Sequence, residues 1–140
     1  MIIGTIKEKK KFENRVSISP EEVKNYVKSG HQVLVEKNAG LQSGFSDRLY
    51  KEAGASMSSA KDILKSVDIL LKINCPSPDE AKQLKASSMV ISQLNIQNEI
   101  DSIKIFNSKK VSAFSLERVP RITRAQDMDI LSSQANLAGY

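Results

Sequence analysis

Residues 67–73 read VDILLKI, and residues 77–80 shortly after them read SPDE. The first stretch is nearly continuous in apolar residues, as is typical of a strand that is buried on both faces of a parallel sheet. The second stretch offers a capping hydroxyl at Ser77, a proline at the first helical position and, at Glu80, a carboxylate that can cap in return. A buried strand followed at once by a well-capped helix predicts an α/β fold.

The same alternation of strand and helix patterns extends along the chain, which predicts a Rossmann-like or flavodoxin-like parallel sheet flanked by helices. A second capping signal, SPEE at residues 19–22, begins a helix that ends at Gly30, where glycine suits the left-handed C′ position. Strands are predicted at Ile2–Ile6, Gln32–Glu36, Val67–Ile73, Met89–Leu94 and Val111–Phe114. The other helices are predicted at Ser46–Ala53, at Ser58–Ser66, from Pro78, at Asn98–Phe106 and from about Gln126.

The turn after the first strand lacks the usual dinucleotide signal. Many nucleotide-binding folds of this kind carry Gly-x-Gly-x-x-Gly there, so that the backbone can approach a pyrophosphate at a helix N-terminus. Here the first strand leads into KKKFEN at residues 9–14, and the 6 glycines of the chain are not spaced in that way. The chain by itself is therefore not expected to hold a dinucleotide in the usual manner.

Composition excludes several other classes of protein. With 140 residues, 40% of them hydrophobic, the chain has the size and composition of one globular domain. A net charge of +5 with 5% aromatic residues does not favour nucleic-acid binding. Apolar runs stay well below the roughly 20 residues of a membrane span, so a soluble, cytoplasmic domain is expected. A single cysteine, Cys75, and a single histidine, His31, allow neither an internal disulfide nor a metal cluster.

Two basic residues are placed where a ligand could bind. Arg15 precedes the helix that begins at Pro20, whose N-terminus attracts anions. Lys72 lies near the carboxyl end of a buried strand, which is where open α/β sheets usually bind ligands. Arg15 could instead be a structural residue that donates hydrogen bonds to loop carbonyls, and the residues alone leave both interpretations open.

The densest polar stretch is ERVPRITRAQDMD at residues 117–129, after the last predicted strand. Pro120 prevents one continuous helix, so Arg118, Arg121 and Arg124 are not expected to form a single helical stripe. A loop with fixed bends is predicted instead. Such a loop could bring an arginine, an amide and a carboxylate around a polar ligand, or it could be a solvated loop held by Arg–Asp pairs.

The first 47 residues resemble a known family. Two segments are similar to the N-terminal signature and the next loop shared by alanine dehydrogenases and transhydrogenase alpha subunits, and the resemblance extends over essentially the whole chain. The matching positions are Gly4, Glu8, ENRV at 13–16, SP at 19–20, Val23, Gly30 and AGLQSGFSD at 39–47. Ile6 stands where the family usually has proline and Glu22 where a small residue is common, and neither departure touches the chemistry.

The C-terminal third resembles transhydrogenases. Residues 118–126 read RVPRITRAQ and residues 128–140 read MDILSSQANLAGY, and both are similar to transhydrogenase alpha subunits. In that family an Arg-Gln-Asp loop lies over the nicotinamide of NAD(H), where an amide and charged groups orient the carboxamide and fix which ring face offers its hydride. The resemblance implies that the matching positions here are Arg121, Gln126 and Asp129, with Ser132 close by.

Asn95 separates the two branches of the family. Alanine dehydrogenases bind pyruvate with an arginine and a lysine, which match Arg15 and Lys72, and they use a catalytic histidine that would fall near position 95. Without that histidine, amination of pyruvate loses its proton-transfer partner, whereas direct hydride transfer between two nicotinamides needs none. Arg15 and Lys72 are then expected to shape the site or to serve the structure.

The resemblance implies that this chain is the N-terminal part of the NAD(H)-binding subunit of a proton-translocating transhydrogenase. Such an enzyme passes a hydride between NAD(H) and NADP(H). Residues 1–125 would form an N-terminal α/β domain, and residues 126–140 the start of a helix leading to an NAD-binding domain missing from this chain. The other expected partners are a membrane domain, an NADP(H)-binding domain and a second copy of the subunit. The chain would then be a soluble peripheral domain at the cytoplasmic side of the inner membrane, inactive alone. The alternatives are an alanine dehydrogenase and a non-enzymatic binding module, which the missing glycine signal would suit.

Overall fold

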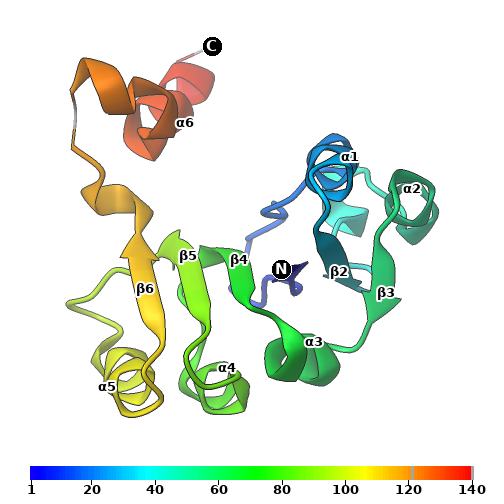
Figure 1. The fold of residues 1–140 in the computed structure, drawn as a ribbon. Coiled ribbons are helices and arrows are strands. Elements are labelled where there is room, and N and C mark those ends of the chain that lie inside the picture. The colour runs from blue at the N-terminus through cyan, green and yellow to red at the C-terminus, as the bar shows by residue number, and fades with distance from the viewer. Residues whose placement is uncertain (121, 140) are drawn as a thin grey trace.

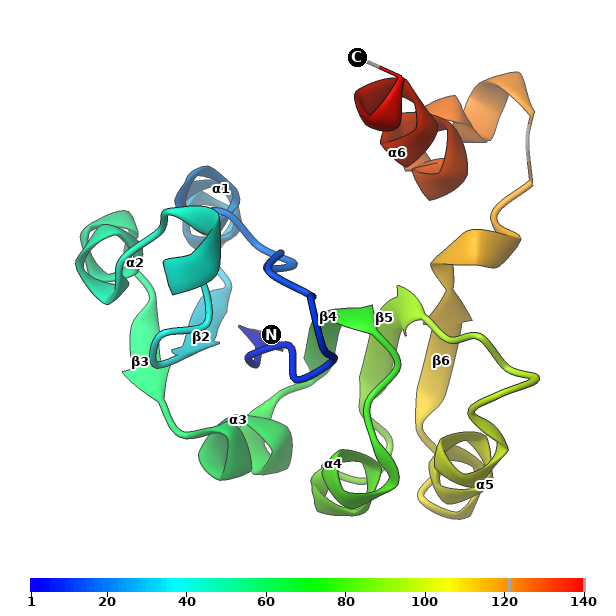
Figure 2. The same cartoon turned by 180° about the vertical axis from the view of Figure 1, so that it is seen from behind.

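The computed structural model describes residues 1–120 and 122–139. These residues form a six-stranded sheet in the order β3-β2-β1-β4-β5-β6, with parallel neighbours throughout (Figures 1 and 2). The strands are β1 (Ile2–Thr5), β2 (Gln32–Glu36), β3 (Ser56–Ser58), β4 (Ile69–Asn74), β5 (Met89–Gln93) and β6 (Ser112–Ser115). The α-helices are α1 (Pro20–Lys28), α2 (Asp47–Ala53), α3 (Ala60–Ser66), α4 (Pro78–Gln83), α5 (Ile100–Ser108) and α6 (Ile130–Ala138). Short 3₁₀-helices are η1 (Leu41–Ser43), η2 (Leu116–Arg118) and η3 (Thr123–Met128).

Helices cover the sheet in two layers. α1 and α2 lie on one face, and α3, α4 and α5 lie on the other (Figure 1). The connecting helices lie on the other face of the sheet after β3, because α3 leads from the β3 edge back past β1 to β4. β1 and β4 are therefore neighbours whose following segments turn to opposite faces, and the carboxyl edge at such a point is where open α/β sheets bind ligands. The predicted fold class is confirmed.

The predicted strands are all present, with differences at their boundaries. The strand predicted from Val67 begins at Ile69, because Val67 still donates its N–H into the preceding helix. The prediction that a helix begins at Ser58 is wrong. Ser58 ends β3, and the hydroxyl of Ser59 caps α3 by accepting the N–H of Asp62. β3 is absent from the prediction, because its two serines give it no apolar alternation.

Helix ends follow the predicted capping chemistry. Ser77 accepts the N–H of Glu80, whose carboxylate accepts the N–H of Ser77 in return, so α4 begins with a complete capping box. Gly30 follows α1 with a φ of 87°, in the left-handed region. The helix predicted from about Gln126 divides into η3 and α6, with Asp129 as the N-cap of α6. Across residues 1–120 and 122–139, none of the helices has the length and apolar character to cross a membrane.

Each face of the sheet carries its own apolar core. On the α1 side, Val35 packs with the buried Tyr50, whose hydroxyl donates to the carbonyl of Ile18 at 2.7 Å. On the other side, residues of α3, α4 and α5 pack against β4 and β5. Gly4 allows α3 to approach β1 closely, because a Cβ there would lie 2.5 Å from Cγ1 of Val67. The two cores fix the strands from both faces and hold their carboxyl ends at one edge.

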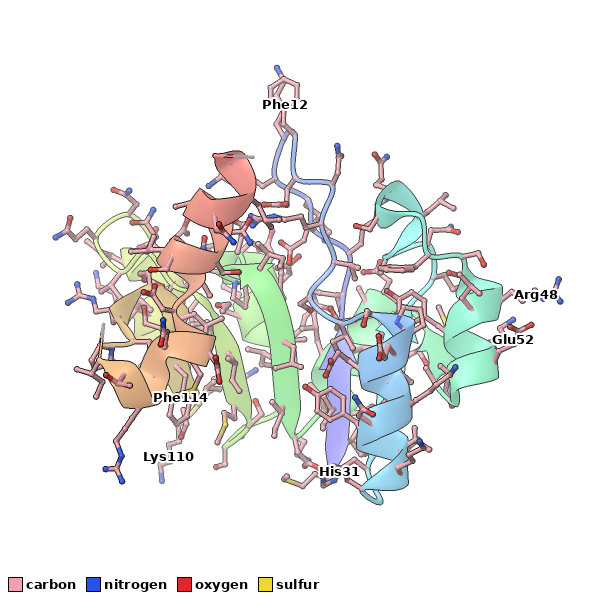
Figure 3. The ribbon with its side chains drawn as sticks, turned by 90° about the horizontal axis from the view of Figure 1, so that it is seen from above. Phe12, His31, Arg48, Glu52, Lys110 and Phe114 are labelled. Carbon is pink, nitrogen blue, oxygen red and sulfur yellow. The ribbon has the colours of Figure 1, made fainter. Side chains whose placement is uncertain are left out.

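The α1-side face of β4, β5 and β6 is less covered. Leu71, Ile91 and Phe114 lie in register across these strands. Phe114 stands on the edge strand and is 54% exposed (Figure 3). α6 lies on the same side of the sheet as α1 and packs against η2 (Figure 3).

Candidate functional site

Polar side chains gather at the carboxyl edge of the sheet, around the ends of β1 and β4. The loop between β1 and α1 runs through residues 6–19 and carries Phe12 at its tip (Figure 3). His31 lies at the opposite, amino edge, where its Nδ1 is 3.4 Å from the N-terminal amine (Figure 3). The single histidine of the sequence is thus remote from the edge at which these polar residues meet.

Glu8 ties this loop to the end of β4. Its carboxylate accepts the backbone N–H of Ile73 at 2.7 Å. It also accepts the backbone N–H and the side-chain amide of Asn74, at 3.4 and 3.3 Å. The side chain is buried, and Nζ of Lys72 lies 3.7 Å from Oε2. The loop is therefore held against the strand at the point where a ligand would enter.

Lys72 is buried in an ion cluster. Its side chain is 4% exposed, and Nζ lies 3.2 Å from Oε2 of Glu80 and 3.7 Å from Oε2 of Glu8. The exposed Lys9 approaches the other oxygen of Glu80 at 3.3 Å. Burial raises the pKa of Glu80, but the charge of Lys72 and hydrogen bonds from Ser77 and Lys72 outweigh it, and the pKa lies below its usual value. Lys72 lies at the carboxyl end of β4 as predicted, with its charge satisfied inside the protein.

Arg15 is held by Glu13 and reaches the last helix. Its Nε and Nη2 donate to the two oxygens of Glu13, both at 2.8 Å, and Nη1 donates to Oε1 of Gln134 in α6 at 3.0 Å. Asn74 donates to Oε2 of Glu13 at 3.1 Å, which links the pair to the end of β4. The hydrogen bond from Arg15 outweighs burial and lowers the pKa of Glu13 to about 2. All of the side-chain hydrogen bonds that Arg15 makes with described residues go to side chains of the protein rather than to loop carbonyls.

A pocket of about 350 Å³ opens beside the Lys72 cluster. Asn95 lies on its wall with a φ of 45°, and its N–H donates to the carboxylate of Glu117 at 2.8 Å. Cys75 lines the same pocket, and burial together with the charge of Glu99 raises the pKa of its thiol to about 12. A protonated thiol is a poor nucleophile, and a side-chain amide does not ionise near neutral pH and so cannot serve as a general acid or base. Within the described part of the chain, no group of His, Cys, Asp and Glu is arranged to hold a metal ion.

A second pocket, of about 170 Å³, lies between the sheet and α6. Leu71 and Ile91 of the sheet and Ile130 of α6 form apolar walls, while Arg15 and Gln134 provide a polar side. Because these residues come from two strands, a loop and the last helix, the shape of this pocket depends on where α6 sits. The position of α6 is therefore part of the geometry of the site.

Three of the four predicted cofactor residues line one pocket of about 290 Å³, namely Gln126, Asp129 and Ser132. Asp129 caps α6, since its carboxylate accepts the N–H groups of Leu131 and Ser132 at 3.1 and 3.3 Å. It also accepts the hydroxyl of Ser132 at 2.6 Å. These bonds fix Asp129 and Ser132 relative to each other, and Gln126 contributes its amide from η3. The fourth predicted residue, Arg121, lies outside the described residues.

The arginine-rich segment before this pocket is not one helix. η2 ends at Arg118 and η3 begins at Thr123, with Pro120 between them. Proline lacks the N–H that a continuing helix would need, so the chain bends here. As predicted, the described residues of this segment do not form one helix, but residues 123–128 form the 3₁₀-helix η3 rather than an irregular loop. Gln126 of η3 lines the same pocket as Asp129 and Ser132.

Five residues that contribute to the clusters around Lys72 and Arg15 are missing from the predicted site: Glu8, Glu13, Asn74, Glu80 and Gln134. The sequence gives Glu80 a capping role, which the structure confirms, but it contains no sign that Glu80 pairs with Lys72. Glu13 stands out in the sequence only as part of the family signature. The sequence does contain one usable signal: two carboxylates, Glu8 and Glu13, lie in a loop between a strand and a helix. Their charges need partners, which predicts polar contacts at that edge of the sheet.

Comparisons with known proteins show the family to which the chain belongs. The family model described as "Alanine dehydrogenase/PNT, N-terminal domain" matches residues 4–138. The chain is 36% identical over 140 residues to the NAD(P) transhydrogenase subunit alpha of Haemophilus influenzae, covering 100% of this chain and 27% of that protein. The transhydrogenase structure from Sinorhizobium meliloti matches with a TM-score of 0.95 and 40% identity, over 100% of this chain and 42% of that one. An L-alanine dehydrogenase structure matches with a TM-score of 0.80 and 32% identity, over 85% of this chain and 33% of that one.

The chain thus spans between 27% and 42% of the length of these relatives. The family match runs from β1 to α6, so it includes both the carboxyl-edge cluster around Lys72 and the pocket around Gln126. The chain belongs to the alanine dehydrogenase/PNT N-terminal domain family.

Proposed function

We propose that this chain forms one wall of the NAD(H) site of a proton-translocating NAD(P) transhydrogenase, which passes a hydride between NAD(H) and NADP(H). The observation that carries the proposal is the pocket at the start of α6, where Gln126, Asp129 and Ser132 meet. These are the positions at which the sequence resembles the loop that covers the nicotinamide in this family. Arg121 is assigned to the wall from the resemblance alone.

The polar groups of this pocket suit a nicotinamide carboxamide, which carries N–H donors and a carbonyl acceptor. The side-chain amide of Gln126 offers both a donor and an acceptor. Asp129 accepts the hydroxyl proton of Ser132, which leaves the oxygen of Ser132 as an acceptor for a carboxamide N–H. Because the cap of α6 already fixes Asp129 and Ser132, these groups would orient the ring with little loss of side-chain freedom.

The phosphates of the dinucleotide are assigned to another domain. A dinucleotide fold usually binds pyrophosphate at the turn after its first strand. In this chain the loop after β1, residues 6–19, contains no glycine, so it lacks the turn that lets the backbone approach a pyrophosphate closely. Bound NAD(H) would supply the hydride itself. The residues of this chain would orient the nicotinamide, and hydride transfer between two nicotinamides requires no acid or base from them.

Alanine dehydrogenase is the second candidate, since an L-alanine dehydrogenase shares this fold. That function would use Arg15 and Lys72 to bind the carboxylate of pyruvate, as the resemblance implies. Here Arg15 is paired with Glu13 and Lys72 with Glu80, and Asn95 stands near the expected position of the catalytic histidine. These observations favour transhydrogenase. A non-enzymatic binding module is supported only by the missing glycine signal, which the proposed division of the NAD(H) site between two domains also explains.

The context of the whole protein is proposed from the same resemblance. The chain covers 27% of the Haemophilus influenzae subunit, which leaves room for a further NAD-binding domain in a longer polypeptide. A membrane domain, an NADP(H)-binding domain and a second copy of the subunit are the other proposed partners. The chain would then lie at the cytoplasmic side of the inner membrane, with NAD(H) on this subunit and NADP(H) on its partner. The 140-residue chain alone is expected to be inactive.

The test compares NADH binding and hydride transfer in the assembled transhydrogenase with Gln126→Ala or Ser132→Ala. Loss of one hydrogen bond to the carboxamide is expected to weaken NADH binding or slow transfer by about fivefold to tenfold. Gln32→Ala, which changes an exposed glutamine at the amino edge, is the matched control. Unchanged binding and rates in both pocket variants would reject the wall. Pyruvate-dependent NADH oxidation by the wild-type protein would point to alanine dehydrogenase instead.

A further inference from the structure

The last helix carries part of the proposed nicotinamide pocket but buries little surface of its own. Asp129 caps α6, and Ser132 lies in its first turn. Ile130 is partly buried, whereas every described residue of α6 after it is exposed, including Leu137 at 67%. Apolar packing against the described part of the chain therefore does little to determine where this helix sits.

A polar contact joins α6 to the sheet instead. Nη1 of Arg15 donates to Oε1 of Gln134 at 3.0 Å, between residues 119 positions apart. Among the described residues, it is the one recorded side-chain hydrogen bond from Ile130–Ala138 to an element preceding Asp129. Gln134 follows Ile130 by one turn and shares its face of the helix, and both residues line the pocket between α6 and the sheet.

Arg15 is itself fixed from the other side. The fork of Nε and Nη2 holds both oxygens of Glu13, and Asn74 donates to Glu13 at 3.1 Å. Asn74 is the last residue of β4, so hydrogen bonds run without a break from Gln134 through Arg15 and Glu13 to the sheet. A planar guanidinium that serves two partners in fixed directions is well suited to such a link.

We propose that Arg15 is a positioning residue that clamps α6 to the carboxyl edge of the sheet. It acts through Gln134 on the helix that carries Asp129 and Ser132, rather than by binding a ligand anion. Two of its nitrogens are committed to Glu13, and the third faces the helix. The clamp follows from the contacts alone, whereas its effect on the nicotinamide rests on the proposed function.

The clamp is tested by amide hydrogen exchange over residues 130–139 in the full-length, assembled protein without nucleotide. Arg15→Ala and Gln134→Ala are each expected to speed exchange in this helix by about threefold to tenfold, since each removes a hydrogen bond to a charged group. The double variant should exchange no faster than either single one, because both remove the same bond. Gln134→Glu keeps the acceptor and should exchange like the wild type. Ser133→Ala, an exposed neighbour on the same helix, is the control.

Hydride transfer is then measured on the same variants. We expect Arg15→Ala and Gln134→Ala to lower kcat by a similar factor and Gln134→Glu to retain it, a pattern that an arginine binding the ligand directly would not give. Arg15→Lys should resemble Arg15→Ala, because an ammonium cannot hold Glu13 and Gln134 together.

Unchanged exchange of α6 in both Arg15→Ala and Gln134→Ala would overturn the clamp. Faster exchange in the Arg15 and Gln134 variants, combined with unchanged NADH binding and hydride transfer in both Gln126→Ala and Ser132→Ala, would support the clamp and reject the proposed nicotinamide wall. If Arg15→Ala does not fold, Gln134→Ala on the exposed helix decides the question.

Discussion

The ammonium of Lys72 lies 3.2 Å from the carboxylate of Glu80, and each of the two side chains is 4% exposed. Glu8 is the second buried carboxylate beside the same ammonium. Removing one partner of a buried ion pair destabilises a protein much more than replacing the whole pair by apolar residues. The cluster is therefore a point at which a single substitution should have a large effect.

Lys72→Met should lower the free energy of unfolding by about 3–5 kcal/mol, because it removes the buried cation between two carboxylates. Urea denaturation of the wild type and the variant measures the loss. Arg48→Met is the control, since Arg48 pairs with Glu52 on the exposed face of α2 (Figure 3) and should cost less than about 1 kcal/mol. Equal losses of stability in the two variants would show that burial does not make the ion pairs of Lys72 more important than an exposed pair.

Gly4→Ala should destabilise the fold by about 1–3 kcal/mol through overpacking. The added Cβ would lie 2.5 Å from Cγ1 of Val67 and 2.8 Å from Cγ2 of Ile63, both in the packed core between β1 and α3. Thermal unfolding followed by circular dichroism gives the change. Gly139→Ala should be nearly neutral, because its Cβ would make ordinary contact at 3.4 Å with the carbonyl of Ala135. A wild-type melting temperature in Gly4→Ala would show that α3 can move away from the sheet.

The ion pair of Glu13 and Arg15 should make stability depend on pH in the acid range. The pKa of Glu13 falls from an ordinary 4.5 to about 2 in the folded protein. Its contribution is therefore complete above about pH 4.5 and is lost as the pH falls towards 2. The wild type should be more stable than Glu13→Gln near neutral pH, and the difference should shrink across this window in urea titrations. A difference that stays constant down to pH 2 would contradict the depressed pKa.

Cys75 should react slowly with alkylating reagents. Burial and the charge of Glu99 raise its pKa from 9.0 to about 12, so very little thiolate exists at pH 8. Iodoacetamide modification of the native protein, followed by mass spectrometry, should be at least about a hundredfold slower than modification in urea, because only the thiolate reacts. Rapid labelling of the native protein would show that the pocket lined by Cys75 opens to solvent.

Strands and helices with strong local signals were predictable from the sequence. β4 and α4 are the clearest pair, since a continuous apolar run and the cap at Ser77 are both local features. β3 was not predictable in this way, because Ser56–Ser58 has no apolar pattern and is a strand only through its pairing with β2. The sheet order likewise depends on pairings between distant segments, such as Ile3 with Ile69.

The candidate site was predictable in part. Gln126, Asp129 and Ser132 came from a family resemblance within one short segment, and the structure places them around one pocket. Only some of the partners of Lys72 and Arg15 lie nearby in the sequence. Glu13 is two positions from Arg15, whereas Glu8 and Gln134 are far from the residues they contact. A charged residue in a sequence reveals that it needs a partner, but the fold decides which one.

The bond between Arg15 and Gln134 also has a consequence for the order of folding. It joins residues 119 positions apart, so forming it in the unfolded chain would cost much conformational entropy. That cost is small once the sheet has brought the two segments together. On the ribosome, residues 130–138 emerge after every strand of the sheet has been made. We therefore expect α6 to dock only after the six-stranded sheet has formed, and to be released before the six strands separate.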